Sequence, residues 1–246
     1  MKIDGNQPIA RFAADLLGAM AIFESLGLDY ACAGDRSLDD AAHAEGIAPE
    51  VVIASLRKLK AVEHAAAWND RPLVDLTRHL TNQHHRFLRE ELATTALRLS
   101  DLCTSPIHPP SDLISLRAAF ARLSEIVLPH LHREEENVFP AVVALESAWQ
   151  SNQPPAATRA DLSAELHQLA GEHGAISAQL RTMRELRLRL EQSNELPPRC
   201  SAILDAIATL EAHLHEYMFL ENYVLFQRAS ALEAQWSTAP ANGSPA

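Results

Sequence analysis

Apolar residues recur at helical spacing from residue 72 onward, in runs rich in Leu, Ala, Arg and Glu with few Gly. Pro- and Ser-rich breaks at 104–112, 151–158 and 193–199 divide this part of the chain. The pattern predicts four helices over about 72–102, 112–148, 159–193 and 199–231. Pro72 suits a first helical turn, Ser111 or Asp112 can cap the second helix, and Pro129 is expected to kink it. Four long helices with short connections predict an up-and-down four-helix bundle.

The first 66 residues predict a separate small helical domain. Phe12, Leu16, Met20 and Phe23 recur at helical spacing, a bend is expected around Gly34, and two more helices are expected within 37–46 and 48–62. We therefore predict an all-α chain with a small helical domain at 1–66 and a bundle at 67–231. A hinge is expected near 65–72. Residues 232–246 have little to bury and are predicted to be a disordered tail.

Composition and charge narrow the possible functions. The chain has 246 residues, a net charge of −11 and three cysteines. An acidic chain with a pI near 5.5 is a poor general nucleic-acid binder. No apolar run approaches the roughly 20 residues of a membrane span, and the N-terminus does not resemble a signal peptide. Three widely spaced cysteines favour a reducing cytoplasm, so we expect a cytoplasmic protein with no nucleic-acid or membrane partner.

Twelve histidines are the unusual feature of the composition. Nine of them form four clusters, one on each predicted bundle helix: His79/His84/His85, His130/His132, His167/His173 and His213/His215. The other three are His43, His64 and His108. Four clusters at intervals of about 40 to 50 residues suggest four helices that converge on one site.

Two of the helices carry related strings. The second has His130-x3-Glu134-x4-Phe139, and the fourth has Tyr217-x3-Glu221-x4-Phe226. Residues four apart share one helix face, so each string presents a carboxylate and a His or Tyr together. Carboxylates from two helices and imidazoles from the others are typical of di-iron and di-manganese bundles. Such pairs also occur as simple surface pairs, worth about 0.2–0.5 kcal/mol. The absence of a CxxC motif disfavours structural zinc.

The spacing leaves individual ligands open. His84 and His85 are rivals on the first bundle helix, and His167 and His173 are rivals on the third. On the fourth helix the similarity to the His130 string favours Tyr217, whereas His213, four residues earlier, is a second candidate ligand.

The strings TRHLTNQHHRFLREEL, HLHREEENVFP, LAGEHG and FLENYVLF resemble the hemerythrin-like domain of the RIC (repair of iron centres) family, also known as the ScdA/YtfE/NorA type. LGLDYACAGDRSLDDAAHAEGI resembles the short N-terminal domain of the same family. This resemblance covers about residues 8–230 and implies a centre of two non-haem iron ions. Its implied ligands are His85, His130, His173 and the bridging carboxylates Glu134 and Glu221.

Two positions depart from the family pattern. Tyr217 stands where the family has a histidine, and the adjacent cysteine pair of the family is reduced to Ala31-Cys32. We expect Tyr217 to ligate ferric iron as a phenolate, with packing alone as the alternative, in which case His213 or water completes the coordination. Cys32 is the candidate reactive thiol of the small domain.

The resemblance implies a protein of the nitrosative and oxidative stress response. It would bind nitric oxide at the di-iron centre, repair damaged iron–sulfur clusters, or do both. The alternative is a hemerythrin-like oxygen or nitric oxide carrier or sensor without repair activity, and a third hypothesis is a metal-free helical interaction module. The implied partners are nitric oxide or oxygen and damaged iron–sulfur proteins, and a homodimer is plausible.

Overall fold

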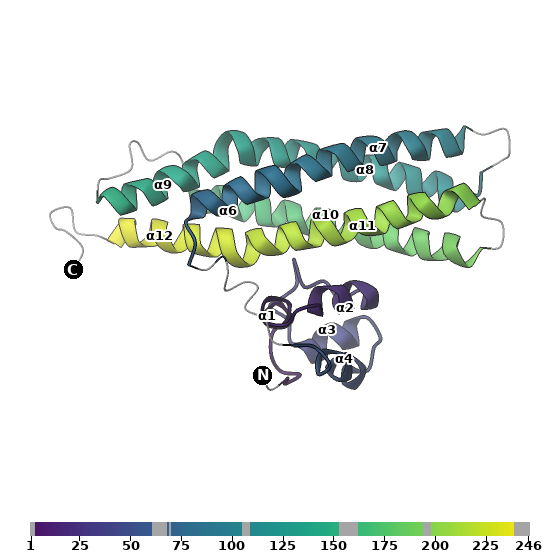
Figure 1. Ribbon diagram of the computed structural model, residues 1–246, viewed down its shortest axis with the longest axis horizontal. Helices are drawn as coiled ribbons and strands as arrows, with labels where there is room; N and C mark the ends of the chain where they lie inside the picture. The colour runs from purple at the N-terminus through teal and green to yellow at the C-terminus, as the bar shows by residue number, and fades with distance from the viewer. Residues whose placement is uncertain are drawn as a thin grey trace.

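The computed structural model describes residues 3–60, 68, 70–104, 109–152, 162–193 and 198–238. Regular structure in these residues is helical, apart from an isolated bridge between Pro8 and Ser37. Long helices lie side by side in an elongated bundle, and four short helices near the N-terminus gather against one side of it (Figure 1). The predicted all-α fold is confirmed.

Four helical rods form the bundle. The first consists of α6 (Leu73–His79), η1 (Leu80–His85) and α7 (Arg86–Cys103). The second consists of α8 (Ser111–Arg133), η2 (Glu134–Val138) and α9 (Phe139–Ser151). The third is α10 (Leu162–Gln192), and the fourth consists of α11 (Pro198–Leu220), η3 (Glu221–Leu225) and α12 (Phe226–Thr238). Each rod contacts the next along the chain and the last returns to the first, as an up-and-down bundle requires.

The interior of the bundle is filled mainly by leucine, isoleucine and valine side chains. Polar groups are buried among them near the three π-helical segments η1, η2 and η3. The kink expected at Pro129 stays a prediction. α8 runs through Pro129 as far as Arg133, and the change of helix type comes at Glu134.

The N-terminal unit contains α1 (Ile9–Asp15), α2 (Ala19–Leu26), α3 (Leu38–Ala44) and α4 (Pro49–Leu56). The stretch that has the spacing of one amphipathic helix is divided into α1 and α2. Gly18 causes the break, because its φ of 90° lies in the left-handed region that favours glycine. Ser37 caps α3, accepting a hydrogen bond of 3.0 Å from the backbone N–H of Asp40. Residues 65–67 and 69 of the predicted hinge lie outside the described residues.

The C-terminal helix extends beyond its predicted end at about residue 231. α12 continues to Thr238, so residues 232–238 do not belong to a disordered tail, and residues 239–246 lie outside the described part of the chain. Leu232 and Trp236 pack against the core, and the Trp236 ring meets Trp149 edge-on at 5.8 Å between centroids. Two apolar side chains in a mostly polar segment were too weak a signal to predict this contact.

A buried charge cluster joins the N-terminal unit to the bundle. Arg184 Nη2 lies 3.2 Å from Glu24 Oε2, and Arg184 Nε lies 2.8 Å from Glu211 Oε1. His215 Nδ1 lies 2.8 Å from Glu24 Oε1. These four residues, Glu24, Arg184, Glu211 and His215, are called the Arg184 cluster below. It ties α2 to α10 and α11.

Within the described residues, none of the helices combines the length and the apolar character needed to cross a membrane.

Glu146 caps a helix of a different rod. The carboxylate on α9 accepts hydrogen bonds from the backbone N–H groups of Leu73 (2.7 Å) and Val74 (3.1 Å) at the start of α6. Pro72, at the N-cap position, makes no side-chain cap of its own. Glu146 therefore satisfies two backbone donors that are otherwise left without a partner at this helix terminus.

Replacement of Glu146 by alanine is expected to lower the free energy of unfolding by about 2 kcal/mol, because two partly buried donors lose their acceptor. Urea denaturation measures the change. Glu125→Ala on the exposed face of α8 is the matched control, with an expected change within about 0.5 kcal/mol. Equal losses in the two variants would contradict this role of Glu146.

Candidate metal centre

Three π-helical segments place acidic and imidazole side chains in the middle of the bundle. η1 ends at His85, η2 begins at Glu134 and η3 begins at Glu221. Single π-helical turns within α-helices occur mostly at functional sites. Here one such turn interrupts three of the four rods at a candidate ligand.

The aromatic residue five positions after each glutamate packs against a histidine from another rod. Phe139 stacks on His85 with ring centroids 5.4 Å apart, and Phe226 stacks on His173 at 5.7 Å. The related strings on the second and fourth rods therefore each supply a carboxylate and an aromatic side chain that packs on a histidine.

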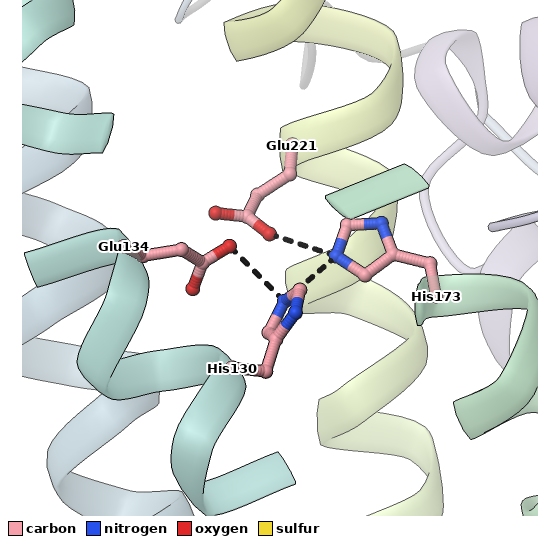
Figure 2. A group of neighbouring side chains, drawn as sticks. All are labelled: His130, Glu134, His173 and Glu221. Atoms are coloured by element: carbon pink, nitrogen blue, oxygen red, sulfur yellow. Dashed lines mark hydrogen bonds and ion pairs between the residues drawn. The ribbon is translucent and has the colours of Figure 1, made fainter. Parts of the chain in front are cut away.

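Two histidines and two glutamates face one another in the bundle interior (Figure 2). His130 Nε2 lies 3.1 Å from Glu134 Oε1, and His173 Nε2 lies 3.2 Å from Glu221 Oε2. The two Nε2 atoms of His130 and His173 are themselves 3.1 Å apart. Ligand atoms from three different rods therefore converge on one small space.

His85 and Tyr217 complete the lining of this space. His85 Nε2 lies 3.4 Å from Glu134 Oε2, and the Tyr217 hydroxyl donates a short hydrogen bond to the same oxygen. The Tyr217 ring meets the imidazoles of His85, His130 and His173 edge-on. Six residues, none more than 1% exposed, form what is called the central cluster: His85, His130, Glu134, His173, Tyr217 and Glu221.

The alternatives left open by the spacing lie outside the central cluster. His84 is buried but faces His213, with ring centroids 4.7 Å apart, and His213 packs on Phe87 at 4.1 Å. Burial and the neighbouring histidines lower the pKa of His84 to about 3. His167 lines a cavity beside the cluster. His85, His173 and Tyr217 line the central cluster, whereas their rivals His84, His167 and His213 do not.

An outer layer of acceptors holds each imidazole. His85 Nδ1 lies 2.8 Å from Glu135 Oε1, His130 Nδ1 lies 2.9 Å from Glu172 Oε2, and His173 Nδ1 lies 2.9 Å from Asn222 Oδ1. An acceptor at Nδ1 places the N–H there, so the Nε2 atom that faces the cluster can offer a lone pair to a metal.

Sequence reasoning did not identify these three acceptors. Each is the immediate neighbour of a cluster residue, but it contacts a histidine on a different rod: Glu135 follows Glu134, Glu172 precedes His173, and Asn222 follows Glu221. A polar residue directly beside a candidate ligand is the signal that could have found them.

Charge is unevenly distributed over the cluster when only protein atoms are considered. Burial opposes ionisation of Glu134, but His130 and His85 more than offset this and hold its pKa well below the usual range. Burial and the nearby Glu134 carboxylate raise the pKa of Glu221 well above its usual value, and the same causes raise that of Tyr217. Burial and His130 lower the pKa of His173 to about 4. Protons therefore occupy positions that a cation would take, and metal binding displaces them.

The donor set fits a metal. With the imidazole N–H at Nδ1, the contacts of 3.1–3.4 Å between Nε2 atoms and carboxylate oxygens join two acceptors and are not hydrogen bonds. Four buried atoms of the cluster then have no hydrogen-bond donor: His85 Nε2, Glu134 Oε1 and both carboxylate oxygens of Glu221. Buried polar groups are almost always paired, so four unpaired atoms around one point need an explanation. Imidazole nitrogens and carboxylate oxygens are suitable ligands for iron or manganese, and a cation would pair all four atoms.

The Arg184 cluster also brings carboxylates and a histidine together, but it differs in one respect. Glu24, Glu211 and His215 lie close enough to hold an ion, yet the Arg184 guanidinium already contacts both carboxylates. The positive charge of this group comes from the protein itself. The central cluster contains no arginine or lysine.

Cys32 lies at the edge of the central cluster rather than inside it. Its thiol donates to the backbone carbonyl of His173 at 3.4 Å and lines a cavity of about 440 Å³ together with His167, Gly174, Asn222 and Tyr223. Burial and Asp29 raise the pKa of the Cys32 thiol well above its usual value. The thiol is therefore protonated at neutral pH. It contacts the backbone of His173 rather than the ligand atoms of the central cluster.

Comparison with known proteins agrees with these observations. Residues 75–229 match the family described as Hemerythrin HHE cation binding domain, and residues 5–60 match ScdA_N, described as Domain of Unknown function (DUF542). The chain is 25% identical over 234 residues to the iron-sulfur cluster repair protein ScdA of Staphylococcus haemolyticus (strain JCSC1435), an alignment that covers 93% of this chain and 100% of that protein. It is 26% identical over 228 residues to the iron-sulfur cluster repair protein YtfE of Escherichia coli O17:K52:H18, covering 93% and 98% respectively.

Proposed function

Because the chain belongs to the hemerythrin HHE cation-binding family and, with its ScdA_N unit, to the RIC group within it, we propose that it is a non-haem di-iron protein that repairs damaged iron–sulfur clusters. The single observation that carries the proposal is the convergence of unpaired imidazole and carboxylate atoms in the central cluster. The related ScdA and YtfE proteins are named for repair of iron–sulfur clusters.

Two carboxylates favour two metal ions over one. Glu134 and Glu221 come from different rods, and three imidazoles surround them. Two carboxylates that bridge two cations, with imidazoles in terminal positions, are the arrangement of di-iron bundles. Iron bound here supplies Lewis-acid positions at which a diatomic ligand such as nitric oxide or oxygen can bind.

The roles of the protein residues follow from their contacts. We propose His85, His130 and His173 as terminal ligands, with Glu134 and Glu221 as bridges. Glu135, Glu172 and Asn222 orient the three imidazoles through Nδ1. The apolar walls formed by Phe139 and Phe226 keep water away from the ligands.

Tyr217 is proposed as a sixth ligand. Its hydroxyl lies among the cluster atoms and donates to Glu134, so the phenol oxygen is already directed at the metal position. Ferric iron is a hard Lewis acid that would displace the phenolic proton on binding, and this proton would be released to solvent, as protons are when a metal binds. A phenolate favours the ferric state and lowers the reduction potential relative to histidine.

Repair gives bound iron the role of cargo, delivered to an iron–sulfur cluster that has lost metal. We place this activity in the cytoplasm during nitrosative and oxidative stress, with damaged iron–sulfur proteins as clients. Cys32 is the proposed functional thiol at the edge of the centre, and a homodimer remains a prediction. The alternative function is reversible oxygen or nitric oxide carriage or sensing by the same centre without repair.

Iron content tests the proposed bridges. The metal-reconstituted protein is expected to hold two irons per chain, and Glu134→Ala or Glu221→Ala is expected to lose most of them, because each bridge serves both ions. Elemental analysis of protein without a histidine tag measures this. Glu136→Ala, two residues from Glu134 but exposed, is the control and should retain two irons. Fewer than one iron in the reconstituted wild-type protein would remove the di-iron proposal.

A visible spectrum tests Tyr217. The oxidised protein is expected to show a broad phenolate-to-iron absorption band that Tyr217→Phe abolishes while iron content stays close to two. Tyr223→Phe, six residues further on the same rod and partly buried, is the control that should retain the band. An unchanged spectrum in Tyr217→Phe would leave Tyr217 as a packing residue.

An assay of cluster repair separates the two candidate functions. The reduced, iron-loaded protein is titrated with nitric oxide, followed by electron paramagnetic resonance, and then incubated with an iron–sulfur enzyme whose cluster was damaged by nitric oxide. Repair predicts recovery of the client's activity together with loss of iron from this protein. Carriage predicts reversible nitric oxide binding with no recovery. Cys32→Ser is expected to retain iron but to slow recovery, with Cys103→Ser, distant in the bundle, as the control.

A further inference from the structure

The three outer partners of the central cluster are not chemically equivalent. Glu135 is a carboxylate that also receives two hydrogen bonds from Arg89, at 2.7 and 3.0 Å. Glu172 is a carboxylate that also receives hydrogen bonds from Arg133 and Gln168. Each is fixed by side chains of the bundle itself. The partner of His173 is the neutral amide of Asn222.

The Asn222 amide is held by the N-terminal unit. Its Oδ1 faces His173 Nδ1 at 2.9 Å, and its Nδ2 donates to the backbone carbonyl of Ala31 at 2.9 Å. An amide has one acceptor end and one donor end, so the Ala31 carbonyl decides which end faces His173. The orientation of this imidazole therefore depends on a backbone atom outside the bundle.

The segment around Ala31 is seated on the turn of α10 that carries His173. Asp29 Oδ2 accepts a hydrogen bond of 2.5 Å from Ser177, one helical turn beyond His173. Asp29 Oδ1 accepts from the backbone N–H groups of Ala31 (3.2 Å) and Cys32 (2.8 Å), which fixes the segment internally. The Cys32 thiol donates to the His173 carbonyl.

Close packing leaves little room for the segment to shift while it remains docked. A Cβ atom at Gly34 would lie 2.7 Å from the Tyr223 hydroxyl and 2.4 Å from the Tyr30 carbonyl oxygen. Only glycine allows this approach, next to Asn222 itself. We call residues 29–34 the docking segment.

We propose that Asn222 is a positioning residue that makes metal retention at His173 depend on the docked state of the N-terminal unit. When the docking segment leaves, the Asn222 amide loses the acceptor that orients it, and His173 loses a fixed partner at Nδ1. Loss of an outer partner typically weakens metal binding by about 10- to 100-fold. Glu135 and Glu172 are unaffected, because their own partners belong to the bundle.

This inference rests on the proposed function and deepens it, because it gives a means of release. An iron centre buried in a bundle holds its metal too well to donate it. A client or any other event that displaces the N-terminal unit weakens one of the three imidazole ligands, and the iron that His173 binds becomes available.

Two substitutions separate docking from the chemistry of the partner. Ser177→Ala removes the hydrogen bond to Asp29 and loosens the docking segment without touching a cluster residue. Asn222→Asp gives His173 a carboxylate partner like those of the other two histidines, but it cannot donate to Ala31. In that background metal retention at His173 no longer depends on docking.

The experiment measures iron release from the anaerobic diferrous protein to an excess of a coloured ferrous chelator. Ser177→Ala is expected to accelerate release of one of the two irons about tenfold, the lower end of the effect of losing an outer partner. The same substitution in Asn222→Asp is expected to leave release within about twofold of Asn222→Asp alone. Thr182→Ala, an exposed hydroxyl on the same helix, is the control. Circular dichroism checks that each variant folds.

Three results would overturn the inference. Release in Ser177→Ala could match that in Thr182→Ala, both irons could accelerate equally, or Asn222→Asp could leave the effect of Ser177→Ala intact. The first would show that docking does not affect metal retention, the second that it does not act on His173 alone, and the third that it does not act through Asn222. A wild-type protein that holds two irons and gives any of these results keeps the proposed function, whereas a protein without iron loses both proposals.

Discussion

Two carboxylates and three imidazoles in a water-free bundle interior need positive charge between them. Glu134 and Glu221 are fully buried, and no lysine or arginine reaches them within the described residues. Without a metal, the proximity of Glu134 and burial raise the pKa of Glu221 well above its usual value, so a proton neutralises one carboxylate. Bound cations would offset the charge of both carboxylates and would pair the buried atoms that have no hydrogen-bond partner. The polar cluster could then lie within the apolar bundle without unpaired groups.

The rest of the structure positions the side chains of the central cluster. In a regular α-helix the residue five positions after Glu134 or Glu221 would point about 140° away from that glutamate, so Phe139 and Phe226 would not lie on the same face as the carboxylates. The π-helical segments reduce this angle by adding a residue to the turn that follows each glutamate. The outer partners then fix the imidazoles, two from within the bundle and one through the N-terminal unit. If His173 binds metal as proposed, metal binding and domain docking meet at this residue.

The sequence predicted the all-α fold and the four bundle helices, because helical periodicity is a local signal, whereas the family came from the resemblance of several sequence strings. Spacing alone left His84 against His85 and Tyr217 against His213 open, because His84 and His85 are adjacent, and His213 and Tyr217 lie one turn apart on the same helix face. The π-helical segments, which shift that register, have no simple sequence signature. The outer partner Glu135 contacts a histidine fifty positions away, and such contacts need the three-dimensional structure. α12 continues beyond its predicted end, where Trp236 packs against Trp149 of another rod.

The central claim is that six residues of the bundle enclose two irons. Diffraction data collected at the iron absorption edge from crystals of the iron-loaded protein test it most directly. The account predicts two anomalous peaks within the central cluster, bounded by His85, His130, Glu134, His173 and Glu221, with the Tyr217 oxygen at bonding distance from one of them. A single peak, or a peak in the Arg184 cluster instead, would contradict it.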